Sequence, residues 1–189
     1  MKKKFWVLLG LLMFSMRLFF AQSAAGQIEI GTTKEIGEKE VVRPGILQWS
    51  SRSSETMKWQ NAMNYCKNLN ENGYSDWRLP DIDELRTILK YKERTVTGGV
   101  CRVSAKSGCL ASNCWSWDTC AKSCDHGWNK CTSYVDGYSK LGDGKLPLWS
   151  FSTLSDYKDA AWGVDFKDGY VNGYNKSANS YVRCVRNAD

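Results

Sequence analysis

Cysteine is the residue type whose chemistry the sequence shows most clearly. An even number of cysteines is typical of exported chains with disulfide bonds. Zinc binding is the alternative, but no two cysteines have the Cys-x-x-Cys spacing that is common in structural zinc sites. His126, the only histidine, lies two residues after a cysteine, and a solvated loop explains it better than a metal site does. The sequence therefore predicts no metal, no cofactor and eight disulfide cysteines: Cys66, Cys101, Cys109, Cys114, Cys120, Cys124, Cys131 and Cys184.

Three acidic residues stand close enough together to be considered as catalytic groups or metal ligands: Asp81, Asp83 and Glu84. Asp81 and Glu84 have the spacing of a helix capping box, and Asp83 adds negative charge near the positive end of the helix dipole. No histidine is nearby in the sequence, so capping is the favoured interpretation. The cluster predicts the start of a helix.

The usual sequence motifs of catalysis are absent. A serine or cysteine hydrolase needs a base beside its nucleophile, and His126 is the only imidazole in the chain. No Gly-x-Ser-x-Gly elbow, phosphate-binding glycine loop or dinucleotide motif occurs. Two carboxylates that meet from distant positions, as in a glycosidase, stay open as an alternative. The sequence predicts a protein that is not an enzyme.

Tryptophan is the residue type that points to binding. Five tryptophans lie in periodic or family-like segments, where core packing is expected: Trp49, Trp59, Trp77, Trp149 and Trp162. Trp115, Trp117 and Trp128 lie in a cysteine-rich segment, where they either contact a ligand or cover the disulfides, and both interpretations stay open. The ligand-binding candidates are these three tryptophans and four residues of a late hairpin: Tyr170, Asn172, Tyr174 and Lys176.

The first 25 residues have the three parts of a secretory signal peptide. Lys2, Lys3 and Lys4 precede an apolar run, and Ser23 and Ala25 lie before a cleavage site at residue 26. A membrane anchor is the alternative, but an arginine interrupts the apolar run. The whole chain has a net charge of +6, and removal of the four basic residues of this segment leaves 22 basic and 20 acidic residues, or +2. The expected location is secreted, periplasmic or at the cell surface, with no transmembrane helix after cleavage and no nucleic-acid partner.

A single domain at residues 45–189 is expected to position these residues, after a loose leader at residues 26–44. A short strand is predicted at residues 46–49. Apolar residues at steps of three and four predict a helix over residues 56–72, with Cys66 on its inward face. A second helix begins at the capping box and has three apolar residues on its inner face: Leu85, Ile88 and Leu89.

Residues 94–148 have no helical or strand periodicity and contain six cysteines. We expect a long insert outside the core, shaped by disulfides, so that residues 101–131 could be deleted without loss of cooperative folding. The last forty residues alternate between apolar and polar types and predict an antiparallel meander whose final strand covers residues 181–186. The fold class is α+β, with two helices packed on a small antiparallel sheet and a long disulfide-rich loop region.

Three segments together resemble a known family. Residues 59–66 read Trp-Gln-Asn-Ala-Met-Asn-Tyr-Cys, residues 73–80 read Gly-Tyr-Ser-Asp-Trp-Arg-Leu-Pro, and residues 181–186 read Tyr-Val-Arg-Cys-Val-Arg. Residues 46–49 and 148–150 have similar counterparts. The pattern resembles the bacterial family known as the Fibrobacter succinogenes major paralogous domain, which includes the C-terminal domain of the Legionella collagen-like adhesin.

The resemblance implies a C-type-lectin-like fold, and it implies binding of sulfated glycans by analogy with the adhesin member. It also implies a disulfide between Cys66 and Cys184. The residues agree, because Cys66 lies on an apolar helix face and Cys184 lies in the last predicted strand. The six cysteines at residues 101–131 are then expected to pair among themselves. The Glu-Pro-Asn and Trp-Asn-Asp motifs of calcium-dependent lectins are absent, so no calcium site follows. A formylglycine-type copper oxidase, from a related family, would need free paired cysteines.

Taken together, the sequence indicates an exported binding module for adhesion or glycan recognition, with a glycan or a host or cell-surface polymer as partner. Four basic residues near the tryptophans could meet an anionic glycan, although they form no continuous block: Arg102, Lys122, Lys130 and Lys145. The alternative is a structural envelope or protein–protein interaction domain without a small ligand. The oligomeric state stays open.

Overall fold

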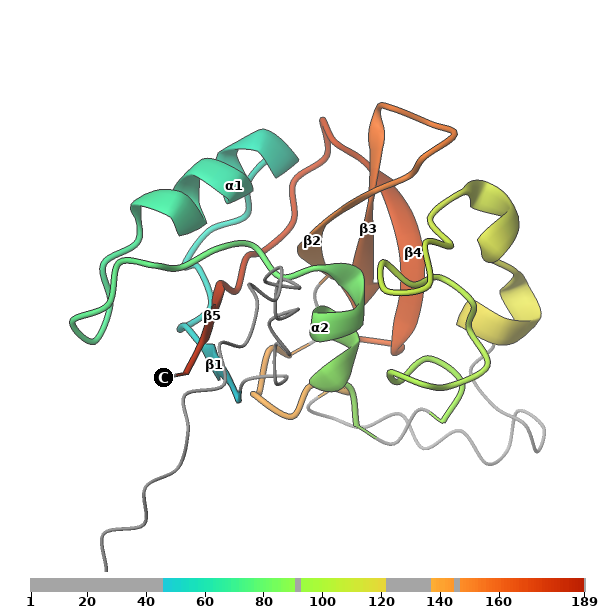
Figure 1. The fold of residues 1–189 in the computed structure, drawn as a ribbon, viewed down its shortest axis with the longest axis horizontal. Helices are drawn as coiled ribbons and strands as arrows, with labels where there is room; N and C mark the ends of the chain where they lie inside the picture. Colours follow the sequence, from blue (N-terminus) through green and yellow to red (C-terminus); the bar gives the residue numbers. More distant parts are fainter. Residues whose placement is uncertain (1–45, 91–92, 122–136, 145–146, 189) are drawn as a thin grey trace, which may run out of the picture. The chain divides into compact units, whose positions relative to one another are not determined.

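The computed structural model describes residues 46–90, 93–121, 137–144 and 147–188, which all belong to one compact unit, Val42–Asp189. Within these residues the fold is α+β, as predicted, with two antiparallel sheets (Figure 1). The larger sheet has the order β2-β3-β4, and the smaller one pairs β1 with β5. The strands are β1 (Leu47–Trp49), β2 (Pro147–Thr153), β3 (Ala160–Asp165), β4 (Tyr170–Asn175) and β5 (Val185–Asn187).

The first helix, α1 (Trp59–Asn68), buries Cys66, as its apolar spacing predicts. It is shorter than the predicted range of 56–72. Met57 and Ser180 exchange two backbone hydrogen bonds, at 2.9 and 3.1 Å, and form an isolated β-bridge. The extended backbone of Met57 therefore prevents the helix from beginning earlier.

The second helix, α2 (Ile82–Thr87), begins as predicted. Asp81 Oδ1 accepts a hydrogen bond from the backbone N–H of Glu84 at 2.8 Å, and Glu84 Oε2 accepts one from the backbone N–H of Asp81 at 2.9 Å. Arg78 adds two further hydrogen bonds to the Glu84 carboxylate, at 2.6 and 2.7 Å. The acidic residues at this position thus close a helix end, as the capping interpretation predicts.

Replacement of Glu84 with glutamine tests the charge of this cap, because glutamine keeps the capping box. Burial opposes ionisation of the carboxyl group, but hydrogen bonds from Arg78 and Asp81 lower the pKa of Glu84 below its usual value of 4.5. A lowered pKa stabilises the fold above the unfolded pKa, and this contribution disappears as the pH falls through the folded pKa. At pH 7 the free energy of unfolding of the wild type should be higher than that of Glu84→Gln by up to about 1 kcal/mol, and near pH 2 the two should be equal. Urea unfolding across this range measures it. A difference that persists in acid would contradict the assignment.

The disulfide between Cys66 and Cys184 is present, with a Cα–Cα distance of 5.4 Å and a sequence separation of 118. Both cysteines are fully buried. The bond joins α1 to the segment that leads into β5. This pairing confirms the expectation drawn from the resemblance and from the two cysteines' positions.

Hydrogen bonds connect the two family-like segments at residues 73–80 and 181–186. Arg186 Nε donates to Asp76 Oδ1 at 2.7 Å. Arg78 and Val185 exchange two backbone hydrogen bonds, at 3.0 and 2.8 Å. These motifs therefore connect the approach to α2 with the C-terminal strand, which is a structural role.

Two late strands differ from the prediction. Strand β5 is shorter than residues 181–186 and pairs with β1 instead of with the late hairpin. The preceding residues bond elsewhere: Tyr181 and Cys184, for example, accept hydrogen bonds from the backbone N–H groups of Trp149 and Ser50. Strand β2 was not predicted, because its first residues fall at the end of the segment interpreted as an insert.

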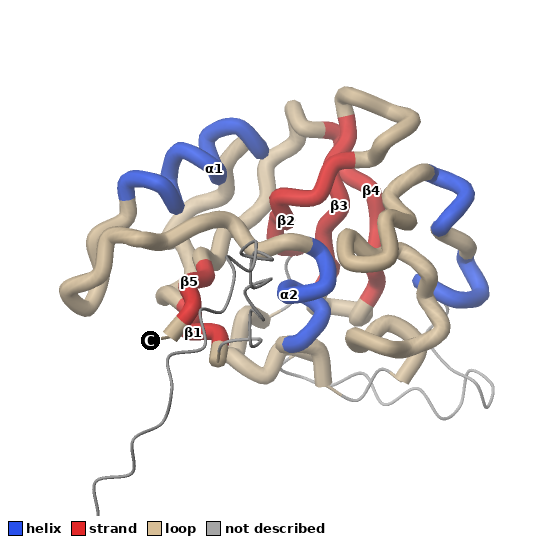
Figure 2. The backbone as a smooth tube through the Cα atoms, viewed as in Figure 1, coloured by secondary structure: helices blue, strands red, loops and turns tan. Residues whose placement is uncertain are grey.

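Residues 93–121 are part of the core, so the expectation of an insert outside the core is wrong for them. Figure 2 shows this segment as loop with two short helical turns, η1 (Ser112–Cys114) and η2 (Trp117–Ala121). Loops bury apolar side chains without a regular spacing, which is why the sequence shows no period there. Deletion of residues 101–121 is now expected to unfold the domain. Four of the segment's residues are buried in the main core: Cys101, Val103, Cys114 and Cys120.

Arg86 of α2 holds this segment in place. Its side chain is 2% exposed, and a buried guanidinium is costly unless its N–H groups are paired. Here the guanidinium donates hydrogen bonds to four backbone carbonyls, those of Thr95, Val96, Cys101 and Val103. The loop therefore wraps around one buried cation.

Candidate functional site

The seven ligand-binding candidates divide into three groups in the structure. Trp117, Tyr170 and Asn172 lie near one end of β4. Trp115 packs on the main core, whereas Tyr174 and Lys176 pack toward α1. Trp128 lies outside the described residues. The sequence predicted one aromatic surface, and the structure assembles only part of it.

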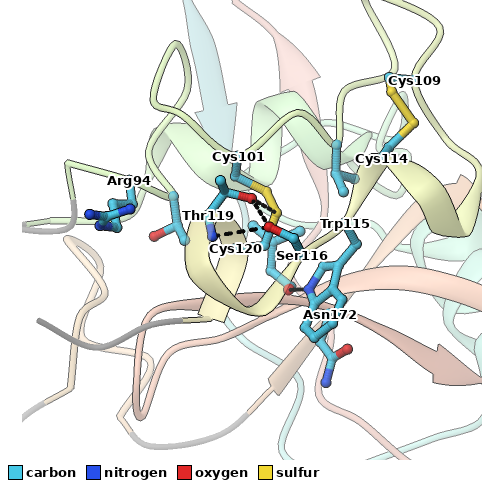
Figure 3. The surroundings of a disulfide bond; sticks show 12 residues. Arg94, Cys101, Cys109, Cys114, Trp115, Ser116, Thr119, Cys120 and Asn172 are labelled. Atoms are coloured by element: carbon cyan, nitrogen blue, oxygen red, sulfur yellow. Dashed lines mark hydrogen bonds between the residues drawn. A yellow bond between two sulfur atoms is a disulfide. The ribbon is translucent and has the colours of Figure 1, made fainter.

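The helical turn η2 lies beside β4, one of the two outer strands of the larger sheet as described (Figure 1). The disulfide between Cys101 and Cys120 fastens this turn to the preceding loop, with a Cα–Cα distance of 4.8 Å. Figure 3 shows the hydrogen bonds around it: Ser116 Oγ lies 2.7 Å from Thr119 Oγ1 and accepts from the Thr119 backbone N–H at 3.3 Å. The turn is thus anchored by a covalent bond and local hydrogen bonds.

Trp115 anchors the same turn to the sheet. Its ring is partly buried against the main core, and its indole N–H donates to the backbone carbonyl of Val171 at 2.7 Å. Among the described strands, β4 lies at an edge of the sheet, and the indole covers a carbonyl of that strand that no described strand pairs with. Of the two interpretations of Trp115, packing is the one that its contacts support.

Trp117 is different, because 58% of its surface is exposed. Its ring lies against Tyr170, with ring centroids 5.9 Å apart and an interplanar angle of 65°. Edge-to-face contact of this kind orients both rings. A largely exposed indole is therefore presented to solvent on a turn that the Cys101–Cys120 disulfide and the Trp115–Val171 hydrogen bond hold in place.

Asn172 lies on the same face of β4 as Tyr170, because alternate strand residues share a face. Its side chain is exposed, and its Oδ1 accepts a hydrogen bond from the backbone N–H of Gly173 at 2.9 Å. Within the described part of the chain, its amide N–H₂ group has no partner. An exposed ring on η2 and an exposed hydrogen-bond donor on the neighbouring strand suit a ligand that has both an apolar face and polar groups at its edge.

Tyr174 follows on the same face, but it packs inward. Its ring contacts Trp149 edge-on, at a centroid distance of 6.0 Å, and covers Gly163, where an added Cβ would lie 3.1 Å from the ring. Burial, followed by the negative charges of Asp165 and Asp168, raises the pKa of the Tyr174 phenol. The hydroxyl therefore stays protonated, and the residue serves packing.

Lys176 also makes contacts within the domain. Its ammonium group lies 4.5 Å from the centroid of the Trp59 ring and donates to the backbone carbonyl of Lys158 at 2.6 Å. Arg102, one of the four basic residues considered for an anionic glycan, is exposed and lines a separate hollow of about 850 Å³. The other three, Lys122, Lys130 and Lys145, lie outside the described residues.

The second cysteine pair inside the segment is Cys109–Cys114, with a Cα–Cα distance of 5.7 Å. Four of the six clustered cysteines therefore pair among themselves, as expected. Cys124, Cys131 and His126 lie outside the described residues. In the part of the chain that the structure describes, no three Cys, His, Asp or Glu side chains converge in a way that could hold a metal ion.

Phe151 is a surface residue that the sequence did not single out. It lies in β2, between buried serines, and 57% of its surface is exposed. Its only sequence signal is a phenylalanine at a position whose strand neighbours are small and polar. That pattern is equally typical of a core strand, which is why it was missed.

The features above define a disulfide-bonded α+β domain with an exposed aromatic surface at a sheet edge. None of the helices described here is long and apolar enough to cross a membrane. A family model described as the Lcl C-terminal domain matches residues 44–186. The chain belongs to this family, the one that includes the C-terminal domain of the Legionella collagen-like adhesin. No curated protein matches the chain.

Proposed function

We propose that this protein is an exported binding module that recognises glycans through a lectin-like surface formed by Trp117, Tyr170 and Asn172. The observation that carries the proposal is the exposed Trp117 ring, held against Tyr170 on an anchored turn. Membership of an adhesin-associated family supports a role in binding at the cell surface. The proposal includes a C-type-lectin-like fold and a signal peptide at residues 1–25.

A sugar ring fits this surface for a physical reason. Its C–H groups form an apolar face that packs on an aromatic ring, while its hydroxyl groups lie at the edge and need hydrogen-bond partners. Trp117 offers the ring, and the exposed Asn172 amide offers donors on β4, the strand that η2 contacts. Because the Cys101–Cys120 disulfide and the Trp115–Val171 hydrogen bond already hold the turn, little conformational entropy is lost on binding.

We propose binding without catalysis. The carboxylates that the structure brings close together have structural partners: Asp81 and Glu84 cap α2, and Asp83 accepts hydrogen bonds from the Ser104 hydroxyl and the Lys106 backbone N–H. Near the Trp117 surface, Asp165 pairs across the sheet with Tyr170 and lies close to Asp168, and its Oδ1 accepts a hydrogen bond from the backbone N–H of Lys167 at 2.8 Å. This carboxylate therefore also has a structural partner, whereas a glycosidase needs two carboxyl groups that are free to act on the substrate.

A glycan array probed with the oxidised domain, residues 26–189, tests the proposal. We expect binding to a defined set of glycans, and we expect the matching free saccharide to compete for it. Absence of any glycan binding, together with concentration-dependent self-association in sedimentation experiments, would contradict the proposal and support the structural alternative.

A further inference from the structure

A β-bulge in β2 turns Phe151 out of the larger sheet. Trp149 pairs with Gly163 and Thr153 pairs with Ala161, so β2 uses two more residues than β3 does between these pairs. Bulges of this kind redirect side chains and are over-represented near functional sites. The ring of Phe151 is 57% exposed although its neighbours in the strand are buried.

Hydrogen bonds to other elements fix the bulge. The backbone N–H of Phe151 donates to the carbonyl of Pro80 at 2.6 Å. The carbonyl of Ser150 accepts from the Trp59 indole at 2.8 Å, and Ser152 Oγ accepts from the backbone N–H of Ile82 at 3.0 Å. These bonds hold the backbone of Phe151 in place, and the described residues leave most of its ring exposed.

Phe151 forms one wall of a cleft of about 540 Å³, a size typical of small-molecule sites. The cleft lies between α1 and the segment that leads into α2. Its apolar lining includes Met63, Trp77 and Leu79, of which Trp77 and Leu79 are almost fully buried. A flat apolar group could therefore lie between the Phe151 ring and this lining.

The charged side chains that line the cleft differ in whether they have a partner within the protein. Arg78 is bound to Glu84 by two hydrogen bonds, and Asp81 accepts from a backbone N–H at the start of α2. Lys67, in the last turn of α1, is exposed and has no ion pair or hydrogen bond with any described residue. Lys67 is therefore the cation of this cleft that no described residue neutralises, and its charge attracts an anion.

We propose that this cleft binds a small planar apolar anion, such as an aromatic carboxylate or sulfonate, with its ring against Phe151 and its charge near Lys67. The Trp117 surface plays no part in this site, so the proposal is independent of the proposed function.

Fluorescence titration with 8-anilinonaphthalene-1-sulfonate, a planar aromatic sulfonate, tests this site in the folded oxidised domain. We expect saturable binding to the wild type and binding at least about tenfold weaker in Phe151→Ala. Tyr157→Ala is the matched control, since Tyr157 is 54% exposed and lies outside the cleft. Trp117→Ala should also bind the dye as the wild type does. Equal melting temperatures of all variants would show that the dye reports a site rather than unfolding.

The charge requirement has its own control in N-phenyl-1-naphthylamine, which lacks the sulfonate. Lys67→Gln should weaken binding of the sulfonate and leave binding of the neutral dye unchanged. Equal binding of the sulfonate by the wild type and Phe151→Ala would overturn the proposal, as would no binding by the wild type. Self-association that is lost in Phe151→Ala would also overturn it, by assigning this surface to a second copy of the chain.

Discussion

Replacing Cys66 and Cys184 together with alanine should lower the free energy of unfolding by about 5 kcal/mol. The bond closes a loop of 118 residues, and constraint of the unfolded chain increases with loop length. A loss of this size is comparable to the whole stability of a small domain, so the variant is expected to be largely unfolded at 37 °C. Chemical denaturation followed by circular dichroism measures the change.

The matched control is the pair Cys109 and Cys114, which closes a loop with a separation of only 5. The same dependence on loop length gives about 2 kcal/mol for its removal. If the two double variants lost equal stability, the long-range disulfide would not be the main constraint between α1 and the C-terminal segment.

Replacing Arg86 with methionine should cost about 3–5 kcal/mol. Methionine fills a similar volume but leaves four buried carbonyl groups without a donor, those of Thr95, Val96, Cys101 and Val103. We expect the loop at residues 93–121 to lose order before the rest of the domain. Hydrogen exchange of its backbone amides, combined with denaturant unfolding, would show both effects.

Arg78→Met is the control for this experiment. The Arg78 side chain is 45% exposed and pairs with Glu84 at the surface, so its loss should cost no more than about 1 kcal/mol. Similar losses from both arginine replacements would show that burial of the Arg86 guanidinium is not what makes it important.

Local signals predicted that both helices and the late hairpin exist, although α2 ends at Thr87, before two of the three apolar residues assigned to its inner face, Ile88 and Leu89. The capping box at Asp81 fixed the start of α2, because its two hydrogen bonds involve residues only three positions apart. The start of α1 was misplaced, since it depends on the backbone pairing of Met57 with Ser180, which lies far away in the sequence. The pairing of β5 was not predicted for the same reason, because its partner β1 lies at the opposite end of the domain's sequence.

The candidate site was only partly predictable. Composition drew attention to Trp115 and Trp117 together, but it could not separate a packed indole from an exposed one. The Trp115 indole donates a hydrogen bond to the carbonyl of Val171, whereas the Trp117 indole is exposed. This difference depends on how η2 lies against β4. Arg86 was not singled out, because a lone arginine on a short helix gives no sign that a distant loop will surround it.

The affinity of Trp117→Ala for a glycan identified on the array tests the central claim most directly. We expect binding at least about tenfold weaker than that of the wild type, because the ring that contacts the sugar is lost. The melting temperature should barely change, because the side chain is largely exposed. Tyr157→Ala, which removes a similarly exposed ring outside this surface, should bind as the wild type does. Undiminished glycan binding by a folded Trp117→Ala variant would contradict the claim.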